Sequence, residues 1–312
     1  MESAPLFEEI ANGPDGGAAH WLKAADGLRI RVGHWPLAGA KGTVLIFPGR
    51  TEFIEKYGVT AKALQADGYA SLAIDWRGQG IADRILGNRM IGHVGRFSDY
   101  QHDVRAAVAH AGALGLPRPY FLLAHSMGGC IGLRALYDGL DVKAAMFSAP
   151  MWGVEMTPVV RIGAWVMSSL AMVLGFSGIL TPGQSTESYV LREDFDKNTL
   201  SNDPEMWELF KRQLLAQPDL GLGGPSLRWV NLSLREMLAL SRMPSPDVPA
   251  LTYLGTREAI VSPERIKDRM AKWPNGKLRV IDGGLHEMLM DKPPMRDLLM
   301  DETVRHFDAH LA

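Results

Sequence analysis

Short apolar runs recur along the chain, and each has the length of a buried strand. Residues 43–47 form a continuous apolar run of the kind found in strands that are covered on both faces. Similar runs follow at residues 70–74, 120–124, 144–147, 251–254 and 278–281. Amphipathic stretches of helix length separate most of them, for example residues 55–66, 99–114 and 262–272. Because strands that alternate with helices form mostly parallel sheets covered on both faces, we predict an α/β fold.

The beginning of the chain has the pattern of a hairpin. Between residues 28 and 32, apolar side chains alternate with Arg29 and Arg31, which is the period of a half-buried strand. Asp26 and Gly27 supply the turn that precedes it. We therefore predict a half-buried strand at this point of the chain.

The alternation of strands and helices stops between Pro150 and Pro249. This interval contains no buried-strand run, only helical patterns and turn residues such as Gly183 and Pro204. An insertion of this length between two strands is best explained as a helical cap over one edge of the sheet. We predict an α/β core made of residues 1–150 and 249–312, with the cap at residues 151–248.

One segment of the predicted cap, residues 162–184, contains no charged residue. A membrane span is disfavoured because the segment holds Gly163, Gly175 and Gly178, and because a lone span here would disrupt the sheet. Two interpretations remain. The segment either forms a cap helix that lines an acyl pocket and touches a membrane surface, or it only packs the cap against the core.

Composition narrows the class of protein. The chain has 33 basic and 35 acidic residues, a net charge of −2, and so lacks the basic excess of a nucleic-acid-binding protein. With 46% hydrophobic and 22% charged residues, it is not a disordered chain. Its single cysteine, Cys130, excludes an internal disulfide and a thiolate zinc site. Residues 1–12 do not resemble a secretory signal, so we expect a cytoplasmic protein.

A serine lies at the turn where a predicted strand gives way to a helix. The run at residues 120–124 is followed by His125, Ser126 and then a helical pattern, which is the context of a nucleophile elbow. Ala124 and Gly128 flank Ser126 at two residues' distance, and both are small enough to let the strand and helix approach closely. The alternative is a serine that merely caps a helix. We predict that Ser126 is a catalytic nucleophile.

A serine hydroxyl needs a base and an orienting acid, and the last two predicted strands are followed by both. His286 is the only histidine in a glycine-rich loop at the end of a strand. Glu258 is the only acidic residue in the loop after residues 251–254. The alternative for Glu258 is a surface carboxylate that pairs with Arg257. We predict a triad of Ser126, His286 and Glu258.

Two backbone amides are expected to bind the negative charge that develops on the substrate. One belongs to Met127, directly after the nucleophile, and the other to Arg50, in the loop after residues 43–47. The Arg50 side chain and Glu52 either bind substrate or pair with each other to brace this loop, and for Glu52 we favour bracing. Whether the Arg50 side chain contacts substrate is left open.

Together these residues resemble a known superfamily. The segments that carry the resemblance are residues 47–57, 75–80, 124–129, 223–230, 255–261 and 283–287. They are similar to segments of α/β-hydrolases, and within these to bacterial lysophospholipases and monoacylglycerol lipases, the branch being indicated mainly by PGRTEF and GGPSLRW. The chain departs from that pattern at Pro48, where relatives often have histidine, and at Glu258, where aspartate is usual. The resemblance implies a substrate with one acyl chain on a glycerol-type head group.

We therefore predict a serine carboxylic ester hydrolase that forms an acyl-enzyme on Ser126. Its expected substrate is a small-molecule acyl ester. We expect no nucleic-acid partner and no metal or organic cofactor. The cap is the surface that could touch the inner face of the membrane. The alternatives on the same triad are a short-chain carboxylesterase and a cofactor-free perhydrolase. A catalytically silent binding protein is a more remote alternative. The sequence gives no indication of the oligomeric state.

Overall fold

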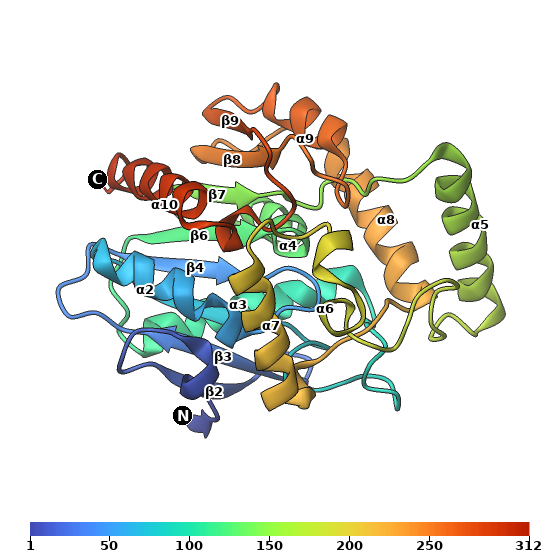
Figure 1. The fold of residues 1–312 in the computed structure, drawn as a ribbon, viewed down its shortest axis with the longest axis horizontal. Helices are drawn as coiled ribbons and strands as arrows, with labels where there is room; N and C mark the ends of the chain where they lie inside the picture. The colour runs from blue at the N-terminus through green and yellow to red at the C-terminus, as the bar shows by residue number, and fades with distance from the viewer. Residues whose placement is uncertain (312) are drawn as a thin grey trace.

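A single twisted sheet runs through the computed structural model, which describes residues 1–311 (Figure 1). The strands within this range lie in the order β1-β2-β3-β5-β4-β6-β7-β8-β9. The first three pair in antiparallel fashion and β3 joins β5 in the same way, whereas β5, β4, β6, β7, β8 and β9 are parallel to one another. The mostly parallel sheet confirms the predicted α/β fold. The strands are β1 (Glu2–Ala4), β2 (Ala18–Lys23), β3 (Arg29–Trp35), β4 (Thr43–Phe47), β5 (Ala70–Asp75), β6 (Tyr120–His125), β7 (Ala145–Ser148), β8 (Ala250–Gly255) and β9 (Gly276–Ile281).

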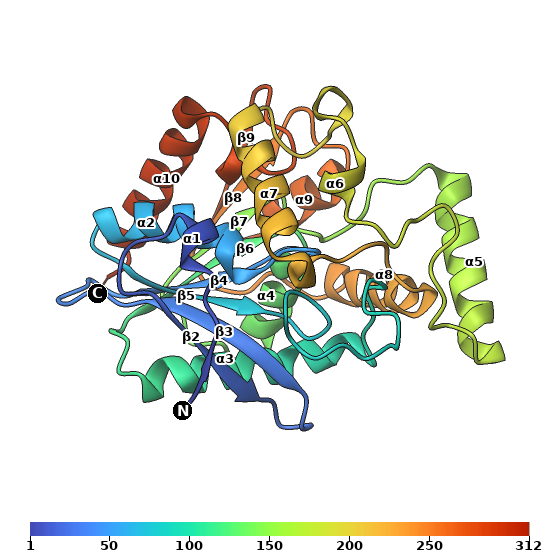
Figure 2. The ribbon, with the colours of Figure 1, turned by 60° about the horizontal axis from the view of Figure 1, so that its bottom comes forward.

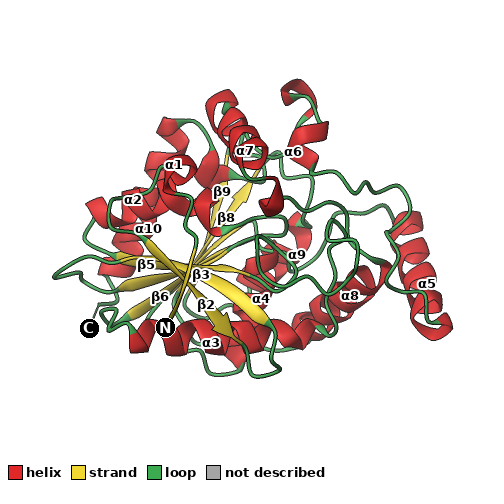
Figure 3. Cartoon of the chain, turned by 90° about the horizontal axis from the view of Figure 1, so that it is seen from below, coloured by secondary structure: helices red, strands yellow, loops and turns green. Residues whose placement is uncertain are grey.

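Helices cover both faces of this sheet, as the strand–helix alternation predicts. Figures 2 and 3 show α2 and α10 on one face and α3 and α4 on the other. A short 3₁₀ turn, η1 (Ile54–Tyr57), leads directly into α2. The helices of the core are α1 (Glu8–Ala11), α2 (Gly58–Ala66), α3 (Tyr100–Ala113), α4 (Met127–Tyr137), α9 (Pro263–Met270) and α10 (Pro293–Asp308).

Four further helices lie between β7 and β8 in the chain and beyond the carboxyl ends of the parallel strands (Figure 1). The outermost, α5, packs against α8, and α8 in turn contacts α4 of the core. In residues 1–311, none of the helices is both long enough and apolar enough to cross a membrane. We refer to these helices and their connecting loops as the cap: α5 (Pro158–Leu174), α6 (Tyr189–Arg192), α7 (Pro204–Ala216) and α8 (Leu227–Ser241).

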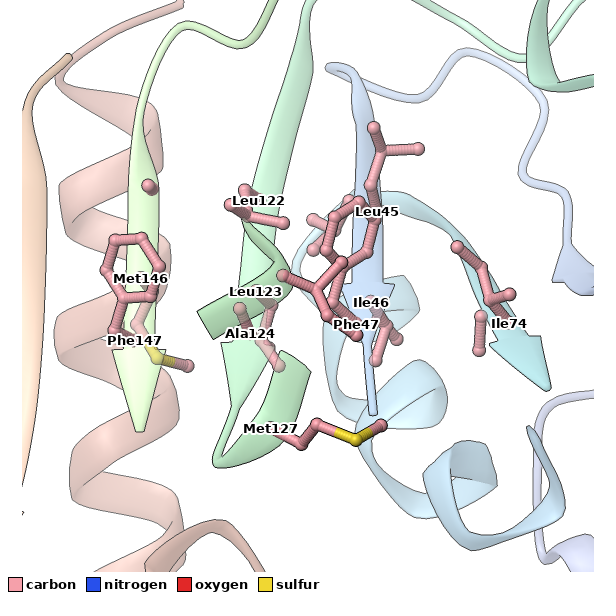
Figure 4. Packing of buried hydrophobic residues seen from close by; sticks show 14 of the residues in the cluster. Leu45, Ile46, Phe47, Ile74, Leu122, Leu123, Ala124, Met127, Met146 and Phe147 are labelled. Carbon is pink, nitrogen blue, oxygen red and sulfur yellow. The ribbon is translucent and has the colours of Figure 1, made fainter. Parts of the chain in front are cut away.

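The apolar strands β4 and β6 pack into the centre of the core, directly beneath the loops that carry the predicted catalytic residues. Ile46 and Leu123 are completely buried, and Met127 extends this packing at the start of α4 (Figure 4). Phe47 at the end of β4 meets Trp76 edge to face, with ring centroids 5.1 Å apart. Close packing of this kind restricts the loops that follow β4 and β6 to one arrangement.

One arginine of the opening hairpin is placed differently from the sequence-based prediction. Arg31 is completely buried instead of lying on a solvent-facing side of β3. Its Nε donates to Asp75 at 2.7 Å, and its two terminal nitrogens donate to Glu55 at 2.8 Å. Since β3 lies between β2 and β5 and is covered by other segments, its polar positions are enclosed and Arg31 needs two carboxylate partners.

Candidate active site

Ser126 lies at a sharp turn between β6 and α4. Its backbone has φ 50° and ψ −117°, a conformation that is strained for a residue with a side chain. The approach of strand to helix leaves no room at Gly128, because a Cβ atom there would lie 2.0 Å from the carbonyl oxygen of Phe47. This geometry is that of the nucleophile elbow predicted from the sequence, with Ala124 in place of the usual first glycine.

Three loops bring the predicted triad residues together. The Nε2 atom of His286 lies 2.9 Å from Oγ of Ser126, and its Nδ1 atom lies 2.8 Å from Oε2 of Glu258. Ser126 and His286 are both buried, at 9% and 3% exposure. In this geometry His286 can accept the Ser126 proton while Glu258 fixes the orientation of the ring.

The Glu258 carboxylate is held by more than the histidine. Its second oxygen, Oε1, accepts hydrogen bonds from the amides of Ile260 at 2.7 Å and Val261 at 3.1 Å. Burial would raise the pKa of Glu258, but the contact with His286 and the two amides outweigh burial and keep the pKa below its ordinary value. Glu258 therefore stays ionised beside the ring, and it does not pair with Arg257, which bonds to Asn202.

The loop after β4 carries the predicted oxyanion donor Arg50 and is fixed from several sides. Trp76 donates its indole N–H to the carbonyl of Pro48 at 2.9 Å. The Gln79 side chain donates to the Gly49 carbonyl at 3.0 Å and accepts from the Thr51 amide at 3.2 Å. Among the described residues, the Arg50 amide donates to no acceptor of the protein. It is therefore free to bind a substrate oxygen.

The second predicted donor, Met127, begins α4. The first amides of a helix have no partner within the helix, and they carry the positive end of its dipole. The position directly after Ser126 thus offers an N–H group beside the nucleophile. Arg50 lies in the loop after β4, and Met127 lies at the start of the helix after β6, the strand next to β4 in the sheet.

A buried group of ionisable residues lies behind the predicted triad, and the sequence analysis found only part of it. The group consists of Glu52, Lys56, His125 and Glu287. Glu52 accepts hydrogen bonds from the Gly49 amide, Lys56 and Tyr57, so it braces the loop as expected, but with Lys56 and not with Arg50. Lys56 also donates to Glu287, the residue after His286, at 2.6 Å. The charged Lys56 thereby links the loop after β4 to the loop that carries His286. Its position as i+4 from Glu52 is the one signal in the sequence that could have revealed this pairing.

Glu52, His125 and Glu287 have the spacing of a metal site, since their ligand atoms all lie within 4.8 Å of one another. However, the Lys56 ammonium bonds both carboxylates and so supplies the positive charge that a metal ion would bring. We therefore assign the group to support of the active-site loops. His125 has its Nδ1 atom 3.0 Å from the Ser148 carbonyl and its ring centroid 4.8 Å from that of His286.

Burial controls the charges in this group. It lowers the pKa of His125 to about 3, so the ring beside His286 is neutral. Burial would raise the pKa of Glu52, but Lys56 and His125 reverse this effect and lower the pKa to about 2. For Glu287, burial together with the nearby Glu52 charge raises the pKa to about 7 despite Lys56. The carboxylate of Glu52 is thus firmly ionised, whereas that of Glu287 binds a proton more readily.

Comparison with known proteins identifies the family of the chain. Residues 38–293 match the protein family described as "Serine aminopeptidase, S33". The chain belongs to this family. It is an α/β-hydrolase and a serine hydrolase, as the sequence analysis predicts.

Two curated relatives and one solved structure illustrate where the chain stands within the α/β-hydrolases. It is 26% identical over 311 residues to a probable lysophospholipase L2 of Haemophilus influenzae, covering 98% of this chain and 94% of that protein. It is 29% identical over 277 residues to lysophospholipase L2 of Escherichia coli strain K12, and the match covers 86% of this chain and 80% of that protein. A soluble variant of monoglyceride lipase from Saccharomyces cerevisiae has the same fold, with a TM-score of 0.73 and 18% identity. The match covers 93% of this chain and 94% of that structure.

Proposed function

We propose that this serine hydrolase cleaves the ester bond of single-chain acyl lipids, of the lysophospholipid or monoacylglycerol type, with Ser126, His286 and Glu258 as its triad. The observation that carries the proposal is the chain of contacts from Glu258 through His286 to the Ser126 hydroxyl. The relatives named lysophospholipase and monoglyceride lipase support the class of substrate.

In the first step, the Ser126 oxygen attacks the ester carbonyl while Nε2 of His286 takes its proton. The positive charge that forms on the ring is stabilised by the ionised Glu258 at Nδ1. The carbonyl oxygen becomes negative and is bound by the amides of Arg50 and Met127. Each such donor lowers the barrier by roughly 3–4 kcal/mol. Because the donors are held by the protein, little reorganisation accompanies the attack.

In the second step, His286 passes its proton to the leaving alcohol, and the C–O bond of the ester breaks. The acyl group now forms an ester with Ser126. Water then attacks this acyl-enzyme, with His286 taking its proton, and the fatty acid leaves as Ser126 recovers its hydrogen. The head group thus departs before the acyl chain. This order predicts a covalent intermediate that can be trapped.

The acyl chain needs an apolar pocket close to the triad. A cavity between core and cap is lined by Thr51, in the loop after β4, and by the charged residues Glu52, Lys56 and Glu287. Most of its remaining wall is apolar, so it offers apolar contacts to the part of an acyl chain that is nearest the ester. The apolar residues that line it are Phe53, Val190, Leu200, Phe210 and Leu214.

The cap meets the lipid surface through the exposed side of α5, and the protein works from the cytoplasm at the inner face of the membrane. Val159, Leu170 and Val173 are 80%, 54% and 84% exposed, and only one residue of this helix, Arg161, is charged. An exposed apolar side of this kind can be buried in the interface of a membrane. Leu170→Glu combined with Val173→Glu is expected to abolish co-flotation with phospholipid vesicles, whereas equal flotation of this variant and the parent would contradict the membrane contact.

The substrate class is tested by hydrolysis of two lipids that share one long acyl chain and of one short-chain ester. We expect release from lysophosphatidylethanolamine or from monoacylglycerol at a higher kcat/KM than from the short ester p-nitrophenyl butyrate. Hydrolysis of the short ester without release from either lipid would overturn the lipid assignment and favour a short-chain carboxylesterase. Peracid formation, assayed with acetate and hydrogen peroxide, identifies a perhydrolase.

A further inference from the structure

The Arg50 side chain lies between the core and the cap. One terminal nitrogen donates to the carbonyl of Gly223 in the cap. The guanidinium carbon lies 5.3 Å from the ring centroid of Trp229 on α8, within the range of a cation–π contact. The Trp229 indole is itself fixed by a 3.2 Å hydrogen bond to the Tyr100 hydroxyl. The cation is therefore held in one place by the protein.

This cation has no counter-charge. Among residues 1–311, no carboxylate pairs with Arg50, and its Nε atom is buried without a hydrogen-bond partner. The second terminal nitrogen is bonded to no acceptor in the same part of the chain. Burial without a carboxylate lowers the pKa of Arg50 to about 10, which still leaves it charged at neutral pH. A desolvated, unpaired guanidinium is a costly feature unless an anion binds there.

The unpaired cation belongs to the residue whose amide is proposed to bind the ester carbonyl oxygen. The guanidinium lies between the core and the cap, so a head group that extends from the bound ester along this boundary would meet it. The two segments that indicate the lysophospholipase and monoacylglycerol lipase branch in the sequence, one with Arg50 and the other with Gly223 and Trp229, meet at this side chain.

We propose that the Arg50 guanidinium is a subsite for the phosphodiester of a lysophospholipid head group. A guanidinium presents its N–H donors in a plane and matches two oxygens of a phosphate. The protein then favours an anionic glycerophosphodiester over the uncharged glycerol of a monoacylglycerol. This inference rests on the proposed function, since it assigns the head group of the same substrate.

Arg84 provides a matched control at the same boundary of core and cap. It too is half-buried and has an unpartnered Nε atom. In contrast to Arg50, both of its terminal nitrogens are occupied by main-chain carbonyls, including those of Gly78 and Gly80. Arg84 thus acts as a clamp between loops, and its loss has no reason to alter the choice between two head groups.

The test compares kcat/KM for two substrates with the same oleoyl chain, lysophosphatidylethanolamine and monooleoylglycerol. For Arg50→Gln, we expect the ratio of the two values to fall by about 10- to 100-fold in favour of the monoacylglycerol. Arg50→Lys is expected to restore part of the ratio, and Arg84→Gln to leave it unchanged. Equal losses on both substrates in Arg50→Gln would show that Arg50 only links the cap to the core, and would overturn the subsite.

A second measurement uses the unaltered protein and does not depend on the folding of a variant. Glycerophosphoethanolamine is expected to inhibit p-nitrophenyl butyrate hydrolysis competitively, and more strongly than glycerol does at equal concentration. Inhibition by glycerophosphoethanolamine no stronger than by glycerol would overturn the subsite. Equal inhibition by inorganic phosphate would also overturn it as a head-group site, and would indicate a site for free phosphate.

The two proposals fail in different ways. If the protein releases fatty acid only from monooleoylglycerol, the phosphodiester subsite is wrong while the lipid hydrolase stands. If it cleaves neither lipid but reacts with a fluorophosphonate probe at Ser126, the lipid assignment is wrong and the subsite falls with it. If it does not react with the probe, the triad itself is wrong.

Discussion

The imidazole Nε2 of His286 lies 2.9 Å from the hydroxyl oxygen of Ser126, although 160 residues separate them in the chain. The parallel sheet produces this contact by placing the loops after β6 and β9 at the same edge. Ser126→Ala removes the only atom that can attack in this geometry, so kcat for ester hydrolysis is expected to fall by at least about 10⁴-fold. Steady-state kinetics test this, and Ser233→Ala on α8 is the control.

The Ser126→Ala variant is expected to keep the fold, because the lost oxygen bonds only to His286 among the described side chains. A thermal midpoint close to that of the parent therefore accompanies the loss of turnover. Residual turnover of the variant above about 10% of the parent rate would contradict the assignment of Ser126.

The second prediction concerns the acid. Glu258→Gln replaces the charge at Nδ1 of His286 with a neutral amide that can present either its oxygen or its N–H₂ group. We expect kcat to fall by about 10³- to 10⁴-fold, because the imidazolium is no longer stabilised and the ring can adopt the wrong tautomer. Glu258→Asp retains the charge on a shorter side chain and is expected to lose less activity.

Glu264→Gln is the control for the acid, since it removes an exposed carboxylate at the start of α9, shortly after the loop that carries Glu258. Its kcat is expected to match that of the parent. Turnover of Glu258→Gln within threefold of the parent would show that another group orients His286.

The third prediction concerns the close approach of α4 to β4. In Gly128→Ala the new Cβ would lie 2.0 Å from the Phe47 carbonyl oxygen, so strand and helix must separate. We expect a loss in the free energy of unfolding of about 3 kcal/mol or more. Chemical denaturation measures this, and kcat is expected to fall as well because Ser126 and Met127 move with the helix.

Gly163→Ala is the matched control for that experiment. Gly163 lies in helix α5, and nothing lies within 4 Å of the position of its Cβ. Alanine there is expected to stabilise the protein by up to about 1 kcal/mol, because it favours the helix. If both substitutions changed the stability equally, the contact at Gly128 would not be restrictive.

The fourth prediction is a pH dependence of stability that comes from Glu287. Its pKa is about 7 in the folded protein and 4.5 in the unfolded chain, so the folded state holds a proton that the unfolded state has released between these values. The resulting stabilisation is complete below the lower value and is lost as the pH rises through about 7. We therefore expect Glu287→Gln to gain stability relative to the parent between pH 5 and pH 8.

Thermal midpoints at several pH values test the role of Glu287. The exposed Glu208 on α7 gives the control Glu208→Gln, for which no pH-dependent difference from the parent is expected. An offset between Glu287→Gln and the parent that stays constant from pH 5 to pH 8 would show that Glu287 has the same protonation in both states.

Local patterns were sufficient to predict most of the sheet and the elbow. The run at residues 43–47 coincides with β4, and the strand before Ser126 ends one residue later than expected. Such runs are informative because a strand that is buried on both faces has only apolar positions. The pattern of residues around Ser126, Glu258 and His286 likewise predicts their meeting, since parallel strands end at one edge of the sheet.

Other features depend on partners that are remote in the chain. Arg31 alternates with apolar residues as an exposed arginine would, and only the positions of Glu55 and Asp75 in the fold explain its burial. The bond between Lys56 and Glu287 spans 231 residues and leaves no periodic signal. The sequence also does not reveal the role of the Arg50 side chain, because its lack of a carboxylate partner is a property of the assembled core and cap.

The central claim is that Ser126 carries the acyl group during turnover. Mass spectrometry of protein that is acid-quenched while it hydrolyses p-nitrophenyl butyrate tests this most directly. We predict a butyryl adduct on the peptide that contains Ser126, formed at once in the parent, strongly delayed in Glu258→Gln and absent in Ser126→Ala. An unmodified Ser126 during rapid turnover, or an adduct on another residue, would contradict the account.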